Sequence, residues 1–219
     1  MAQEVEIAVK PIFFTPLFVV TVPDADRLND ELRKAILERE ATAPAYSDHE
    51  VVGWSSPHDL SMLQWAGAPL QRLFEFVVGV AEQLTEFTQQ PSNQPPRPHW
   101  QVAETWANVQ RTGGSNAAHP HPGSFWSAVY YVDVGDIATN PNCGGELQLF
   151  DPRGCLPRML APYLRYTMPE LHDAGSSISY QPEAGQCVLF PGWLSHAVAR
   201  YTGQKPRISV AFNLDPVLK

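Results

Sequence analysis

The sequence predicts a mainly β fold, a double-sheet jelly roll braced by helices on its N-terminal side. Its second half contains seven or eight short segments rich in β-branched and aromatic residues, separated by Gly, Pro and Asn turns. Two amphipathic helical patterns precede these segments, and 21 prolines and 6 tryptophans suit a loop-rich β architecture. This number of strands after two helices fits a jelly roll, and a sandwich without a pocket is the alternative.

The composition is that of a globular protein. The 219 residues predict a single domain over 1–219, with 1–90 as helical and strand support and 99–219 as the jelly-roll core. Hydrophobic residues make up 44%, and the net charge of −8 argues against nucleic acid or an anionic membrane as partner. Three cysteines without CxxC spacing, no signal-peptide pattern and no long apolar run indicate a cytoplasmic protein, monomeric or oligomeric.

The N-terminal part begins with two expected strands, residues 5–9 (VEIAV) and 18–22 (FVVTV). An amphipathic helix over residues 23–40 follows, with Asp24 or Asp26 as its N-cap. Its apolar stripe consists of Leu28, Leu32, Ile36 and Leu37.

A loop over residues 47–60 separates this helix from a second one, expected over residues 69–87. The second stripe consists of Leu70, Phe74, Val77, Val78, Ala81 and Leu84. The proline-rich segment 91–98 cannot be helical, and the pattern changes to β after it. The expected strands are 99–111, 125–134, 144–150, 176–180, 186–190, 196–201 and 207–214.

The stretch SNAAHPHPG, residues 115–123, places two imidazoles two residues apart, each before a proline. The prolines favour extended backbone at His119 and His121, so both rings should point the same way. Two neutral nitrogen donors suit a divalent transition metal. The alternative is a pair of surface histidines in a Pro-Gly loop, because short motifs are often coincidental.

Two late segments bear on the same place. His196 begins a strand after the Pro-Gly bend of FPGWLSH, where a jelly roll brings early and late strands to one mouth. In RISVAFNL, Arg207, Ser209, Ala211 and Asn213 alternate with the apolar residues Ile208, Val210, Phe212 and Leu214. Because the apolar set belongs in a core, the first set should face into the barrel. An inward arginine needs an anion, either a ligand carboxylate or an internal acid such as Glu146 or Asp151.

The strand before the histidine pair also alternates. In TWANVQR, Trp106, Asn108 and Gln110 share one face. Inward amides are costly unless they bind something, so Asn108 and Gln110 are candidates to orient a ligand's carboxylate or keto group. The same face could instead lie on the outside of the sheet.

Together these motifs resemble the Fe(II)- and 2-oxoglutarate-dependent oxygenases, and more closely a bacterial and phage group related to prolyl 4-hydroxylases. HxH, FPxWLxH and RxS carry the resemblance, with GWSSPHDL, WANVQ and GGELQLFDPR extending it along nearly the whole chain. It implies a double-stranded β-helix, Fe(II) and 2-oxoglutarate as cofactor and co-substrate, and hydroxylation of a small molecule or peptide. Carried over, His119 and His196 are metal ligands, and Arg207 with Ser209 receives the distal carboxylate of 2-oxoglutarate.

The chain departs from the family where the usual HxD or HxE carries its carboxylate, because His121 stands there. We favour three histidine ligands, a neutral set that also admits a metal other than iron. The alternative makes His121 a supporting residue, with Glu146 or Asp151 as the third ligand.

Two further function classes remain. A cupin-type metalloprotein shares the fold and an HxH, but no acid follows His121 before Asp133, and a cupin does not need Arg207 and Ser209. A non-catalytic jelly-roll binding module is the third reading. Stable binding of 2-oxoglutarate separates the oxygenase from both.

Overall fold

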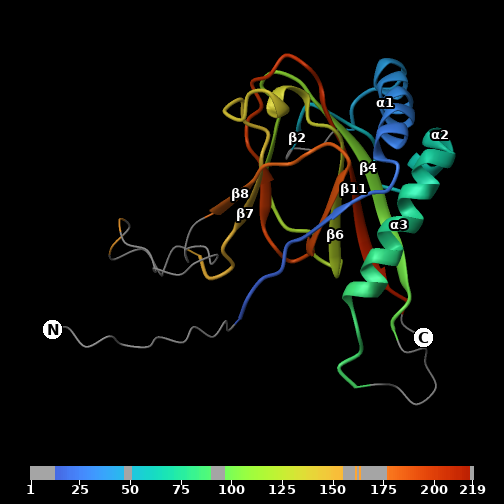
Figure 1. The fold of residues 1–219 in the computed structure, drawn as a ribbon, viewed down its shortest axis with the longest axis vertical. Coiled ribbons are helices and arrows are strands. Elements are labelled where there is room, and N and C mark those ends of the chain that lie inside the picture. The colour runs from blue at the N-terminus through green and yellow to red at the C-terminus, as the bar shows by residue number, and fades with distance from the viewer. Residues whose placement is uncertain are drawn as a thin grey trace.

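A computed structural model describes residues 13–46, 51–89, 97–154, 161, 163 and 177–217. All strand pairs in it are antiparallel, and they form two sheets (Figure 1). The six-stranded sheet has the order β1 (Phe18–Thr21), β9 (Gln186–Pro191), β6 (Trp126–Asp133), β11 (Arg207–Pro216), β4 (Trp100–Gln110), β3 (Trp54–Ser55). The five-stranded sheet has the order β2 (Val51–Val52), β5 (Ser115–His119), β10 (His196–Val198), β7 (Leu147–Phe150), β8 (Ser177–Tyr180).

The helices cover the outer face of the six-stranded sheet, beside β4 and β11 in Figure 1. They are α1 (Ala25–Thr42), α2 (Met62–Ala66) and α3 (Ala68–Leu84). The short 3₁₀ helix η1 (Gly135–Ala138) lies apart from them and packs Ile137 into a second core cluster with Tyr131 and Leu147. Among the described residues, none of the helices has the length and hydropathy that crossing a membrane requires. Two antiparallel sheets with helices on one outer face confirm the predicted mainly β jelly roll.

Alternation along β11 explains how the two faces of this sheet differ. Ile208, Val210, Phe212 and Leu214 are fully buried and pack in the core that the helices cover. The residues between them face the second sheet, as the sequence predicted. The apolar stripes of both helices face the same core, with Leu28, Leu32, Leu70 and Val77 buried in it.

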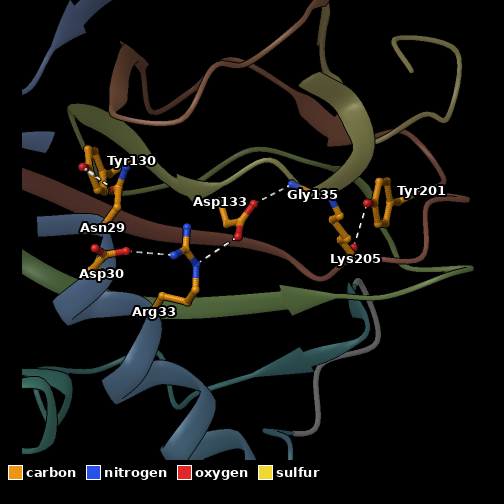
Figure 2. A network of polar contacts seen from close by, with 8 residues as sticks. All are labelled: Asn29, Asp30, Arg33, Tyr130, Asp133, Gly135, Tyr201 and Lys205. Atoms are coloured by element: carbon orange, nitrogen blue, oxygen red, sulfur yellow. Dashed lines mark hydrogen bonds and ion pairs between the residues drawn. The ribbon is translucent and has the colours of Figure 1, made fainter. Parts of the chain in front are cut away.

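Polar contacts attach α1 to β6 (Figure 2). Arg33 donates to Asp133 and to Asp30, each at 3.0 Å, while the Tyr130 hydroxyl donates to Asn29 at 2.6 Å. Because β6 pairs with β11, these contacts fix α1 against the outer face of the six-stranded sheet, the face away from the second sheet.

The turn that leads into β11 is closed by its own contacts. The Tyr201 hydroxyl donates to the carbonyl oxygen of Lys205 at 2.7 Å (Figure 2) and accepts the N–H of Asp136 at 2.8 Å. The Asp136 carboxylate in turn accepts the N–H groups of Gln204 and Lys205. This turn ends at Arg207, so the start of β11 is held in place.

Several local expectations differ from the structure. The loop expected over 47–60 contains β2 and β3, which join the edges of the two sheets. Asp24 is the N-cap of α1 as expected, but it is left-handed (φ 52°) and its side chain makes no capping hydrogen bond. The strand expected at residues 5–9, like Cys155, lies outside the described residues.

Candidate functional site

Three histidines from neighbouring strands meet between the two sheets. β5 and β10 pair with His196 opposite His119, so these side chains leave adjacent strands on one face. His121 follows two residues after His119, and its ring centroid lies 5.1 Å from that of His119 and 4.9 Å from that of His196. One nitrogen from each ring lies within 4.8 Å of the other two, so a single metal ion could be held by all three.

Two turns that touch each other place His121. Its backbone N–H donates to the Gly192 carbonyl at 2.8 Å, and the Gly192 N–H donates to the Phe125 carbonyl at 2.9 Å. A Cβ on Gly192 would lie only 2.3 Å from the Ser124 carbonyl oxygen, so glycine is required for this approach. The Pro-Gly bend before His196 therefore also positions the loop that carries His121.

Hydrogen bonds at Nδ1 decide which nitrogen the first two rings offer. Nδ1 of His119 lies 2.7 Å from the Ala117 carbonyl oxygen, and Nδ1 of His196 lies 2.9 Å from that of Leu194. A carbonyl oxygen only accepts, so in each neutral ring the proton sits on Nδ1 and the lone pair on Nε2. Both rings therefore offer Nε2 as a metal ligand.

The third ring follows the same pattern through side chains instead of backbone. Nδ1 of His121 lies 2.5 Å from Oδ1 of Asn213 and 2.9 Å from Oγ of Ser127. Burial lowers the pKa of His121 to about 4 and that of His196 to about 3, with neighbouring imidazoles adding to the effect. Both rings are therefore neutral near pH 7, which is the state that binds a metal.

Arg207 lies deeper between the sheets and is only 1% exposed. Its Nε donates to the Gly145 carbonyl at 2.9 Å and its Nη1 to Oε1 of Gln110 at 2.8 Å, while the guanidinium stands 5.3 Å from the centre of the Tyr131 ring. Within the described residues, Nη2 donates to no protein group, and no carboxylate lies within ion-pair distance. A buried cation in this state calls for an anionic ligand.

The inner cavity that contains Arg207 also contains the histidines. Strand register explains its lining, because Arg207 lies opposite Gln110 and Ser209 lies opposite Asn108 on β4. The cavity is lined by Trp106, Asn108, Gln110, Asn116, His119, His121, Val129, Tyr131, Leu147, His196, Val198, Arg207, Ser209 and Ala211. The inward orientation expected for Trp106, Asn108 and Gln110 is therefore what the structure has.

Two polar atoms in this cavity have no hydrogen-bond partner in the part of the chain that the structure describes. They are the Tyr131 hydroxyl and Oδ1 of Asn108, both fully buried. Buried polar groups are nearly always satisfied, so an unpartnered pair beside a buried arginine indicates a ligand. The alternation of the sequence does not single out Tyr131 for this role. Its register opposite Ser209 across β6 and β11 is the signal that places it at the arginine.

The carboxylates considered as alternative metal ligands do not join the histidines. Among the described residues, the group that could hold an ion contains His119, His121 and His196 and neither Glu146 nor Asp151. Asp151 accepts two hydrogen bonds from the side chain of Arg153, at 3.0 and 2.9 Å. The charge of Glu146 favours the charged form of Arg207, but the ion pairs of the described residues do not include these two.

An outer cleft of about 380 Å³ shares His119 and His121 with the inner cavity. His58 stacks on Trp106 at 4.2 Å between ring centroids, and Trp106 lies 5.5 Å from His121. Glu104 and Asp215 also line the cleft, and its described lining includes no lysine or arginine. His119 and His121 thus line both an inner cavity with a buried cation and an outer cleft with two acidic residues.

Comparison with known proteins identifies the family to which this chain belongs. Residues 104–213, half of the chain, match the family model described as "Putative 2OG-Fe(II) oxygenase". A search of curated protein sequences found no significant match.

Solved structures with the same fold include three prolyl hydroxylases. One from Trichoplax adhaerens, in complex with a hypoxia inducible factor peptide fragment, has a TM-score of 0.59 at 10% identity, covering 90% of this chain and 83% of that chain. The Pseudomonas putida prolyl-4-hydroxylase has a TM-score of 0.52 at 14% identity, covering 91% and 92%. A viral collagen prolyl hydroxylase from Paramecium Bursaria Chlorella virus-1 has a TM-score of 0.50 at 9% identity, covering 90% and 94%.

The family match spans the segments that carry the histidines and Arg207, from β4 through β11. It favours neither a cupin-type metalloprotein nor a non-catalytic module. This chain belongs to the 2OG-Fe(II) oxygenases and is a dioxygenase that depends on Fe(II) and 2-oxoglutarate.

Proposed function

We propose that this dioxygenase hydroxylates a peptide or a compact organic molecule at an iron held by His119, His121 and His196. The observation that carries the proposal is the convergence of three imidazoles beside a cavity that ends at a buried arginine. Iron bound there would supply the activation of oxygen that drives hydroxylation. The three rings contribute no charge, so the ion keeps its full +2, which the dianion 2-oxoglutarate offsets.

The inner cavity is the proposed site for 2-oxoglutarate. Arg207 would receive the distal carboxylate through Nη2, because Nε and Nη1 are already used by Gly145 and Gln110. Ser209 and the unpartnered Tyr131 hydroxyl can donate to the same carboxylate. Asn108, opposite Ser209, can turn its amide toward the ligand from the other strand.

The contacts of Gln110 favour a positioning role over the direct ligand contact that the sequence suggested. Its Oε1 accepts from Arg207, and its Nε2 donates to Oδ1 of Asn116 at 2.6 Å. Both ends of the amide are therefore occupied by protein. We infer that Gln110 aligns the guanidinium and does not contact the co-substrate.

The outer cleft is the proposed substrate side. The Trichoplax adhaerens enzyme with the same fold was solved with a peptide fragment, which supports a peptide here. Nucleic acid is disfavoured, because Glu104 and Asp215 line the cleft and the chain carries a net charge of −8.

We also infer that residues 1–219 act as a single domain. Residues of α1 and α3 share one core cluster with residues of β4, β6 and β11, so residues 1–90 support the part of the fold from 99 to 219. A cytoplasmic location fits the buried free thiols of Cys143 and Cys187.

The test is anaerobic addition of Fe(II) and then 2-oxoglutarate to the metal-free protein. We expect a weak visible metal-to-ligand charge-transfer band that needs both components, and slow release of succinate when oxygen is admitted. His196→Ala serves as the control that lacks a metal ligand, and it should show neither signal. Absence of the band in the wild-type protein at saturating Fe(II) and 2-oxoglutarate would refute the proposed site.

A further inference from the structure

The acceptor for His121 differs in kind from those of the other two rings. His119 and His196 donate their Nδ1 protons to backbone carbonyl oxygens, which can only accept. His121 instead meets two side chains, Asn213 and Ser127, on the strands β11 and β6. Neither of these fixes the proton by itself, because an amide can turn over and a hydroxyl can both donate and accept. Something must hold the amide in the accepting orientation.

Glu104 supplies that constraint. Oε2 of Glu104 accepts a hydrogen bond from Nδ2 of Asn213 at 2.9 Å. The two residues lie directly opposite each other in the register of β4 and β11, so the contact follows from the pairing of the strands. An ionised carboxylate only accepts, so the amide must present its NH₂ to Glu104 and its oxygen to His121. Asn213 is 5% exposed, and it has little room to leave this arrangement.

Ser127 also contacts His121 and Asn213, but it does not determine which nitrogen of His121 carries the proton. Its Oγ lies 2.9 Å from Nδ1 of His121, and it donates to Oδ1 of Asn213 at 3.4 Å. Alone, Ser127 could as well donate to an unprotonated Nδ1. That would place the imidazole proton on Nε2 and remove the lone pair from the side facing the other histidines.

We propose that Glu104 and Asn213 are positioning residues that hold His121 as the tautomer protonated on Nδ1, so that its Nε2 is always the metal-binding nitrogen. This inference rests on the proposed three-histidine site. It gives His121, which stands where the family usually has a carboxylate, an indirect link to the carboxylate of Glu104 through one amide. Such partners orient the ring and raise its strength as a ligand.

Four variants test the hydrogen-bonded chain from Glu104 through Asn213 to His121, called the relay below. Asn213→Leu removes the acceptor at similar volume, and Glu104→Gln allows the amide of Asn213 to turn over. The double variant Glu104→Gln/Asn213→Asp exchanges the amide and the carboxylate, because the amide introduced on β4 can donate to a carboxylate on β11 that still accepts from His121. Asp215→Asn is the matched control: it removes one negative charge from the same cleft, from a carboxylate whose buried Oδ1 has no hydrogen-bond partner among the described residues.

Two measurements are made on each variant. Histidine ¹⁵N NMR of the metal-free protein at neutral pH reports which nitrogen of His121 carries the proton. Titration with Co(II), followed by its visible absorption, gives the metal affinity. We expect Asn213→Leu to lose the Nδ1-protonated signature and to bind Co(II) about 10- to 100-fold more weakly. Glu104→Gln should lie between it and the wild type, Asp215→Asn should match the wild type, and the double variant should recover both properties.

The outcomes separate this inference from the function on which it rests. If the wild type fails to bind Co(II), the three-histidine site is wrong, and the NMR of the metal-free protein still reports on the relay. If Asn213→Leu keeps the Nδ1 proton and binds Co(II) within about threefold of the wild type, the relay is wrong. Should Asn213→Leu fail to fold, the comparison of Glu104→Gln with the double variant decides, and equal affinities in those two would overturn the proposal.

Discussion

Replacing Arg207 tests the co-substrate site more directly than any other change. The guanidinium is buried, uses two of its nitrogens for Gly145 and Gln110, and belongs to a side chain that lines the inner cavity. Truncating one side of a buried, hydrogen-bonded charge pair costs about 2–5 kcal/mol. In binding, this corresponds to a loss of about 30- to 5,000-fold in affinity for 2-oxoglutarate. Arg207→Lys should recover only part, because the ammonium lacks the planar fork.

The same substitution also weakens the fold, and the assay must separate the two effects. Arg207→Ala leaves the Gly145 carbonyl and the Gln110 amide oxygen without their donor, each at a cost of about 1–3 kcal/mol of stability. Binding is therefore measured by calorimetry well below the unfolding midpoint, with Mn(II) in place of iron. Retained Mn(II) binding shows that the metal site is intact, since Arg207 is not among the histidine group.

Arg111→Ala is the matched control for Arg207→Ala. Arg111 lies one residue beyond Gln110, and its side chain pairs at the surface with Glu40 at 2.8 Å. The Arg111→Ala variant should bind 2-oxoglutarate with the same affinity as the wild type. If Arg207→Ala keeps its affinity within about threefold while Mn(II) still binds, the inner cavity is not the site of the distal carboxylate, and the reasoning from the buried cation fails.

Three further predictions concern the histidines. Fe(II) or Mn(II) should raise the thermal unfolding midpoint of the wild type, because the ligands come together only in the folded state. His119→Ala or His196→Ala should each abolish that shift. Full metal occupancy by elemental analysis in either variant would contradict the ligand set. His121→Ala should lose the metal, whereas His121→Asp should keep it, because the aspartate restores a set of two histidines and a carboxylate. Loss of iron in the aspartate variant would show that the imidazole or its contact with Asn213 is needed. The free energy of unfolding of the metal-free protein should fall as the pH drops below about 6.5, because histidines of the unfolded chain gain protons there while the folded pKa values of His121 and His196 are lowered to about 4 and about 3. The loss at pH 5 is about 2 kcal/mol per histidine. Denaturant unfolding of the double variant His121→Asn/His196→Gln should therefore show a shallower pH dependence between pH 7 and 5.

Local pattern determined much of the fold. The helices 25–42 and 68–84 lie within a few residues of the segments expected from their apolar stripes. Both stripes face the core, because a surface helix is stable only when its apolar side is buried. The two edge strands within 47–60 could not be expected, since pairs as short as Val51–Val52 and Trp54–Ser55 carry no periodic signal and exist only through pairing with β5 and β4.

Alternation also determined which side chains look inward. The expectation that Arg207 and Ser209 share a face opposite Ile208 and Val210 needed only the period of a strand, and the structure has that arrangement. The rings of His119 and His121 also lie beside each other as expected, but β5 ends at His119 and the contact of the His121 N–H with Gly192 places the second ring. Within β11 the sequence by itself determined the orientation, because the backbone geometry of a strand leaves a side chain only two faces.

Tertiary structure decided which residues meet. His196 reaches His119 because β10 pairs with β5 in one particular register. Asn213 reaches Glu104 because β11 pairs with β4, and it meets His121 beside Ser127, its partner on β6. Neither contact can be read from spacing, since the two histidines lie far apart in the chain and the register of strand pairing depends on the packing of the whole core. The sequence determined the types of side chain available to the site and the face each one takes. The pairing of distant strands decided that three imidazoles, an amide and a carboxylate form one connected arrangement.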